Sequence, residues 1–147
     1  MTCLILHILS ILVIWPVESH QLLQFRGGGI YYYWQAGFCQ FMQDQGLPEV
    51  PMVGASAGSL SAALFACGVD FQQATDFVVD QAKRYSIYER KSLAFIWGGL
   101  IDEWLEYHLP EELPRRARED VHVTVTPLRL WRRPELKTSF KDKADLK

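Results

Sequence analysis

The sequence predicts an α/β protein, a three-layer α/β/α sandwich with a largely parallel sheet. Short apolar runs alternate with apolar stripes of helical period along the chain, and glycine-rich turns directly follow the first two runs. The 147 residues, of which 49% are hydrophobic and 22% charged, suit one domain with a sizeable core. Disorder is therefore excluded as the general state of the chain.

The first predicted strand and helix lie between residues 21 and 46. Residues 21–25 are an apolar-rich run stopped by Gly27-Gly28-Gly29, which is typical of a strand ending in a glycine turn. A helix is expected next, with one apolar face and glutamines on the other side. The apolar residues at helical spacing are Ile30, Tyr33, Trp34, Gly37, Phe38, Phe41 and Met42.

A second strand and helix are predicted from residue 49 to Gly68. Residues 49–53 form a short buried strand that enters the glycine-bounded turn Gly54–Gly58. The stripe from Leu60 to Cys67 then indicates a helix closed by Gly68.

The remaining elements continue the alternation. Asp70 is placed to cap a third helix, and a fourth, around residues 100–108, must stop before Pro110. Residues 121–125 alternate valine with polar residues, the period-2 pattern of a strand. Residues 136–140 are one more expected strand, and Asp142 is expected to begin a helix.

The apolar residues 1–20 are treated as a separate N-terminal segment, and residues 21–147 as the domain. No Lys or Arg precedes Arg26, and the apolar stretch Met1–Val17 is shorter than the roughly 20 residues that span a bilayer. It is interpreted as a signal or membrane-associating segment, with an extra core-packing helix or a misplaced start as the alternatives. A signal would send the protein along the secretory route.

The net charge argues against nucleic acid as a partner, and the cysteine content argues against a disulfide framework and a zinc site. A formal net charge of -2 and a pI near 6.1 give no electrostatic footprint for nucleic acid. Cys3, Cys39 and Cys67 are widely spaced and odd in number, which fits neither a disulfide framework nor a zinc site. No metal site and no cofactor are predicted.

The segment Gly54-x-Ser56-x-Gly58 has the form of a nucleophile elbow. A serine on a tight turn between a strand and a helix projects its hydroxyl above the sheet, and larger residues at the two glycine positions would meet neighbouring backbone. Ser56 would also lie at a helix N-terminus, where free N–H groups favour developing negative charge. The alternative is a small-residue turn that packs strand against helix.

The glycines Gly27, Gly28 and Gly29 are the candidate oxyanion loop. Their backbone N–H groups can approach the same space because no Cβ blocks them. A nucleotide-binding loop is the alternative, but Tyr32 stands where its third glycine belongs, and no phosphate-binding G-x-x-x-x-G-K-[ST] motif is present.

Together, residues 25–30, the aromatic helix ending at Gly37 and the turn Gly54–Leu60 resemble a patatin-like phospholipase domain, nearest the adipose triglyceride lipase branch. The resemblance covers residues 21–147. It implies a lipid acyl hydrolase with a Ser-Asp dyad, Ser56 as nucleophile and Gly27–Gly29 as oxyanion loop. It also implies a lipid ester substrate, no cofactor or metal, and a membrane or lipid-droplet surface as the place of action.

Two departures from the family pattern matter. The family's glycine motif has a further glycine where Tyr32 stands, and its dyad aspartate precedes glycine, whereas no aspartate here does. We therefore expect a domain truncated before the aspartate motif. The predicted function is a phospholipase or triacylglycerol lipase. The alternatives are a non-catalytic fragment or pseudoenzyme that binds lipid or a partner, and a Ser-Asp-His hydrolase using Asp102 or Asp120 with His122.

Overall fold

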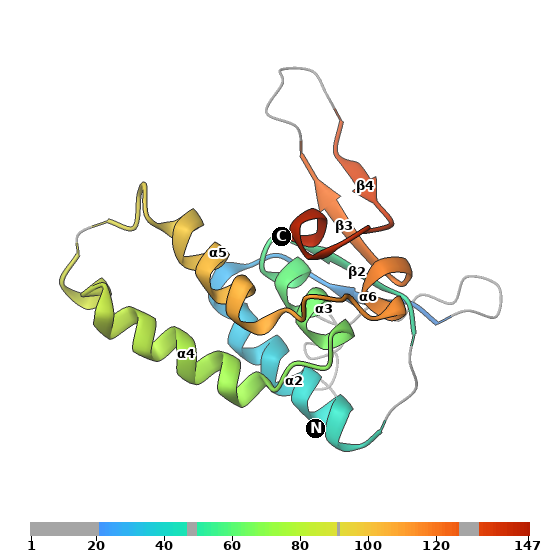
Figure 1. Cartoon of the computed structure of the whole chain (residues 1–147), viewed down its shortest axis with the longest axis horizontal. Coiled ribbons are helices and arrows are strands. Elements are labelled where there is room, and N and C mark those ends of the chain that lie inside the picture. Colours follow the sequence, from blue (N-terminus) through green and yellow to red (C-terminus); the bar gives the residue numbers. More distant parts are fainter. Residues whose placement is uncertain (1–20, 47–49, 91, 127–132) are drawn as a thin grey trace, which may run out of the picture.

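The computed structural model describes residues 21–46, 50–90, 92–126 and 133–147, so the predicted N-terminal segment 1–20 lies outside them. Within these described ranges, the sheet has four strands in chain order, β1 (Leu23–Phe25), β2 (Met52–Ala55), β3 (Val121–Val125) and β4 (Glu135–Lys137). The first three strands are parallel and β4 is antiparallel to β3 (Figure 1). The predicted α/β fold with a mostly parallel sheet is confirmed.

The helices follow the predicted alternation. They are η1 (Gly29–Tyr31), α2 (Tyr32–Asp44), α3 (Ala57–Ala66), α4 (Phe71–Arg84), η2 (Ile87–Glu89), α5 (Trp97–His108), α6 (Arg115–Glu119) and α7 (Lys143–Leu146). Two predicted caps are confirmed, because the Asp70 carboxylate accepts from Gln73 N at 2.9 Å and Asp142 from Asp145 N at 2.9 Å. The last predicted strand is shorter and earlier than expected.

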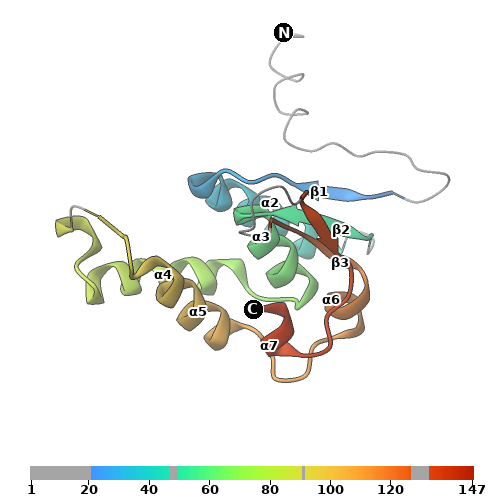
Figure 2. The same cartoon turned by 90° about the horizontal axis from the view of Figure 1, so that it is seen from above.

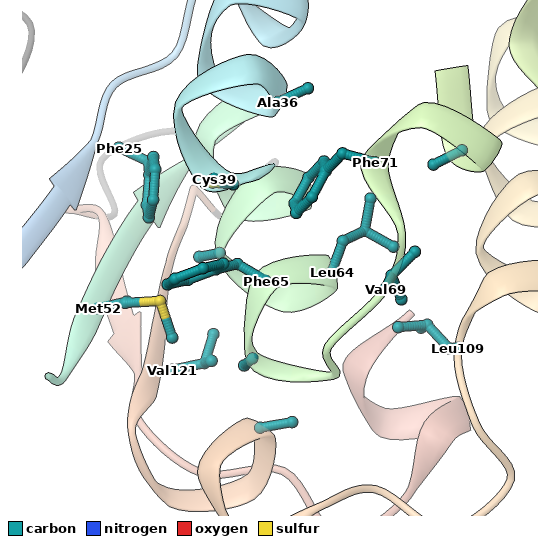
Figure 3. Close-up of a cluster of buried hydrophobic side chains, with 14 of the residues drawn as sticks. Phe25, Ala36, Cys39, Met52, Leu64, Phe65, Val69, Phe71, Leu109 and Val121 are labelled. Carbon is teal, nitrogen blue, oxygen red and sulfur yellow. The ribbon is translucent and has the colours of Figure 1, made fainter. Parts of the chain in front are cut away.

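The core lies between one face of the sheet and α3. Met52 and Val121 point from the strands toward Phe65 of α3, and all three are at least 96% buried (Figure 3). Each such side chain contributes about 1.5–3 kcal/mol by leaving water. Among the described helices, α3 and α6 have the main contacts with the strands.

Helices α4 and α5 lie side by side and lead away from the sheet (Figures 1 and 2). The indole Nε1 of Trp104 donates to the carbonyl oxygen of Ala74 at 3.0 Å, and Gln81 Nε2 donates to that of Leu100 at 3.0 Å. These buried bonds run from the side chain of one helix to the backbone of the other. They hold the helix pair at a fixed register.

The predicted apolar face of α2 is not the face that the structure buries. Tyr33 and Phe41 of this stripe are about half exposed, Phe38 and Met42 are only partly buried, and the buried residues are Tyr32, Gln35, Ala36 and Cys39. Small side chains at positions 36 and 39 let α2 pack closely on α3, while Gln35 is buried because its amide finds hydrogen-bond partners there. Aromatic content was therefore a misleading guide to the core at this helix.

Candidate active site

Ser56 occupies the single residue between β2 and α3. Its φ of 52° and ψ of −124° lie outside the regions that residues with a side chain normally adopt. Such a backbone costs about 1–3 kcal/mol and persists only where the surrounding structure enforces it. The turn leaves the Ser56 side chain exposed at the carboxyl end of β2 and at the N-terminus of a helix.

The two flanking glycines are required by close backbone contacts. A Cβ on Gly54 would lie 2.5 Å from the carbonyl oxygen of Gly58, and one on Gly58 would lie 2.2 Å from that of Phe25. The first contact closes the turn on itself, and the second brings α3 down onto β1. The sharp turn at Ser56 thus depends on missing side chains at both positions.

The glycine loop passes directly beside the serine. A Cβ on Gly27 would lie 3.2 Å from Ser56 Cβ, and Gly29 has the positive φ of 55° that glycine adopts readily. Gly29 and Ser56 also border one cavity. The structure therefore brings the predicted loop and the predicted nucleophile together, although they lie about 30 residues apart in the sequence.

That cavity has a volume of about 620 Å³ and a predominantly apolar wall. Beyond Gly29, Ser56 and Gln81, its lining comes from η1, the helices α2 to α5, and the segment between α4 and α5. These apolar and aromatic residues are Ile30, Tyr32, Tyr33, Ala57, Leu60, Val78, Ala82, Ile87, Tyr88, Leu93, Trp97, Leu100, Ile101 and Trp104. The volume falls in the range of small-molecule sites.

A family model described as patatin-like phospholipase matches residues 23–147, from the first residue of β1 onward. The chain belongs to the patatin-like phospholipase family. Membership indicates, in general terms, an enzyme that hydrolyses lipid esters. No curated protein and no solved structure matches the chain.

No acidic residue or histidine lines the cavity of this patatin-like chain within the described residues. Two carboxylates considered from the sequence have other partners: Asp102 pairs with Lys147 at 2.9 Å and Asp120 with Arg115 at 3.4 Å. His122 lies opposite Val53 in the sheet, three residues before Ser56, and its Nδ1 is buried. The described contacts thus assemble no Ser-Asp-His triad.

The cysteines of this patatin-like domain show no sign of reactivity where they are described. Burial raises the pKa of the Cys67 thiol to about 11 and that of Cys39 further, despite the opposing effect of Arg116 on Cys39. Both thiols are therefore protonated at neutral pH. Within the described ranges, no three His, Cys, Asp or Glu side chains gather as metal ligands.

Sequence reasoning missed the far walls of the cavity. Val78 and Ile101 line it from α4 and α5, yet both read from the sequence as ordinary core positions of amphipathic helices. It also missed Gln35, which appeared on the polar side of α2. A polar residue one helical turn from small residues was the available signal.

Proposed function

We propose that this chain is a serine-dependent lipid acyl hydrolase with Ser56 as nucleophile and the amides of Gly27, Gly28 and Gly29 as the oxyanion site. The observation that carries the proposal is the placement of Ser56, beside the glycine loop, at the wall of an apolar cavity. A strained serine at a helix N-terminus, next to backbone without side chains, fits acyl transfer.

In the proposed reaction, Ser56 Oγ forms a bond to the carbonyl carbon of the ester, and the carbonyl π electrons move to oxygen. The glycine amides and the N-terminus of α3 stabilise that oxyanion. Collapse of the intermediate breaks the bond to the alcohol oxygen, which leaves with the serine proton. Water then attacks the acyl-serine, releasing a fatty acid and restoring the hydroxyl.

The cavity indicates the substrate class. A wall of aliphatic and aromatic side chains favours a hydrocarbon chain and gives few hydrogen-bond partners for a polar acyl group. We therefore propose long-chain carboxylic esters of phospholipid or triacylglycerol type as substrates.

The rim of the cavity suits a lipid surface. Three residues of the lining are strongly exposed: Ile30 at 79%, Tyr88 at 80% and Trp97 at 54%. Tyrosine and tryptophan favour the boundary between water and lipid. We propose that this rim meets a membrane or lipid-droplet surface. Within the described part of the chain, no helix has the length and apolar character to cross a bilayer.

A second candidate function is lipid binding without catalysis. It is favoured by the finding that no described carboxylate or imidazole borders the cavity where it would take the proton of Ser56. Loss of general-base help costs about 10²- to 10⁴-fold in rate. The cavity would then hold an acyl chain that is not cleaved.

Fatty-acid release from phosphatidylcholine vesicles and from triolein emulsions separates the two candidates. The hydrolase proposal predicts release by the wild type and by Ser59→Ala, a control three residues later in the first turn of α3, and none by Ser56→Ala. Release unaffected by Ser56→Ala would contradict it. No release by the wild type, together with saturable binding of a fluorescent non-hydrolysable ether lipid, would support the second candidate.

A further inference from the structure

A buried side-chain bridge joins the glycine loop to α3. Gln35 Nε2 donates to the carbonyl oxygen of Arg26 at 2.8 Å, and the Ser61 hydroxyl donates to Gln35 Oε1 at 2.8 Å. Gln35 is 2% exposed and Ser61 is fully buried. The bridge therefore links three elements: the loop residue before Gly27, helix α2 and the helix that begins after Ser56.

Both ends of the Gln35 amide are used, which fixes its orientation. Arg26 supplies only an acceptor at its carbonyl, so the amide nitrogen must face the loop and the amide oxygen must face Ser61. A buried amide that lost either partner would retain the desolvation cost without the bond. With both hydrogen bonds made, the bridge holds Arg26, Gln35 and Ser61 in one relative arrangement.

We propose that Gln35 is a positioning residue that sets the place of the loop Gly27–Gly29 against the N-terminus of α3. The loop needs such a support, because its glycines are exposed and permit many backbone conformations. Oxyanion donors act at about 2.7–3.1 Å from the oxygen they stabilise, so small displacements matter. An effect of Gln35 on the rate of hydrolysis rests on the proposed function, whereas its role in positioning the loop does not.

The substitution Gln35→Glu tests the bridge because it adds a proton that can be removed. The neutral carboxyl has nearly the shape of the amide and can donate to Arg26 while accepting from Ser61. The ionised carboxylate cannot donate and faces a carbonyl oxygen. Burial raises the pKa of the introduced carboxyl above its ordinary value, so the bridge is present at low pH and lost as pH rises through that pKa.

The primary measurement is the pH titration of the backbone amide resonances of Gly27, Gly28 and Gly29 by ¹H–¹⁵N NMR. In Gln35→Glu these resonances are expected to match the wild type at low pH and to move together as pH rises. The matched control is Gln43→Glu on the same helix, whose wild-type amide donates to the carbonyl oxygen of Val69 at 3.2 Å, away from the loop. This control is expected to leave the three glycines unmoved.

Ser61→Ala gives a second test without a new charge. It removes the donor that orients Gln35 and is expected to displace the same glycine resonances at every pH. Glycine resonances that stay at wild-type positions in both Gln35→Glu and Ser61→Ala overturn the proposal, whatever the activity.

Kinetics complete the test where the wild type hydrolyses lipid ester. In Gln35→Glu, kcat is expected to fall about 10- to 100-fold above the carboxyl's pKa with little change in KM, and to recover below it. Moved glycines with unchanged kcat overturn the catalytic consequence. A wild type without turnover contradicts the proposed function, and the glycine titration still decides the positioning role.

Discussion

Alanine at Gly58 is expected to destabilise the domain, because α3 rests directly on β1 at this position. The added Cβ would lie 2.2 Å from the Phe25 carbonyl oxygen and 2.6 Å from its carbonyl carbon. Normal carbon contacts are about 3.5–4.0 Å, so helix and strand must separate by about 1 Å. Both obstacles are backbone atoms in the sheet, so no side chain can turn aside to make room.

The magnitude follows from two opposing effects. Overpacking in a core costs about 1–3 kcal/mol, and we expect about 3 kcal/mol here because α3 covers three strands. Alanine in a helix returns about 0.5–1 kcal/mol relative to glycine. The net loss of about 2 kcal/mol should lower the midpoint of urea unfolding by about 1 M, measured by circular dichroism.

Gly37 provides the control of opposite sign. It lies exposed within α2, and a Cβ there would meet no atom within 4 Å. Gly37→Ala is therefore expected to raise the free energy of unfolding by about 0.5–1 kcal/mol. The reasoning is refuted if Gly58→Ala unfolds at the wild-type urea concentration, or if both variants lose stability equally.

Three further predictions concern strain, pH and cavity volume. Ser56→Gly should melt a few degrees above Ser56→Ala in calorimetry, because only glycine relieves the positive φ; equal melting temperatures would contradict the strain. Burial lowers the pKa of His108 despite the nearby Asp70, so the folded state favours neutral imidazole, and unfolding free energy should fall as pH drops from about 7.5 to 5.5. Urea melts should show a shallower pH slope in His108→Gln, and an unchanged slope would refute this. Ala82→Trp should reduce release of long-chain relative to short-chain acids by about 10-fold, and an unaltered ratio would show that the acyl chain lies elsewhere.

The local signals in the sequence were sufficient for most of the fold. Period-2 valines gave β3, the capping residues Asp70 and Asp142 gave two helix starts, and Gly54 and Gly58 gave the turn. Each of these signals depends on interactions between residues that lie only a few positions apart in the sequence. The adjacency of Ser56 to the glycine loop also followed, since parallel strands end at one edge of the sheet.

The orientation of α2 did not follow from the sequence because both of its faces carry plausible core residues. The aromatic stripe at Tyr33 and Phe41 has the larger apolar area, but the opposite face has small residues and two internal partners for Gln35. Those partners, Arg26 and Ser61, are 9 and 26 residues away along the chain. Pattern analysis of one helix contains no information about such distant contacts.

The central claim, that Ser56 is a nucleophile at the wall of an acyl-chain cavity, is tested most directly by covalent labelling. The protein is incubated with a long-chain alkyl fluorophosphonate, digested and examined by mass spectrometry. We predict a single adduct on the peptide that contains Ser56, lost in Ser56→Ala and retained in Ser59→Ala. No adduct on Ser56, or equal labelling of the Ser56→Ala variant, would contradict the claim.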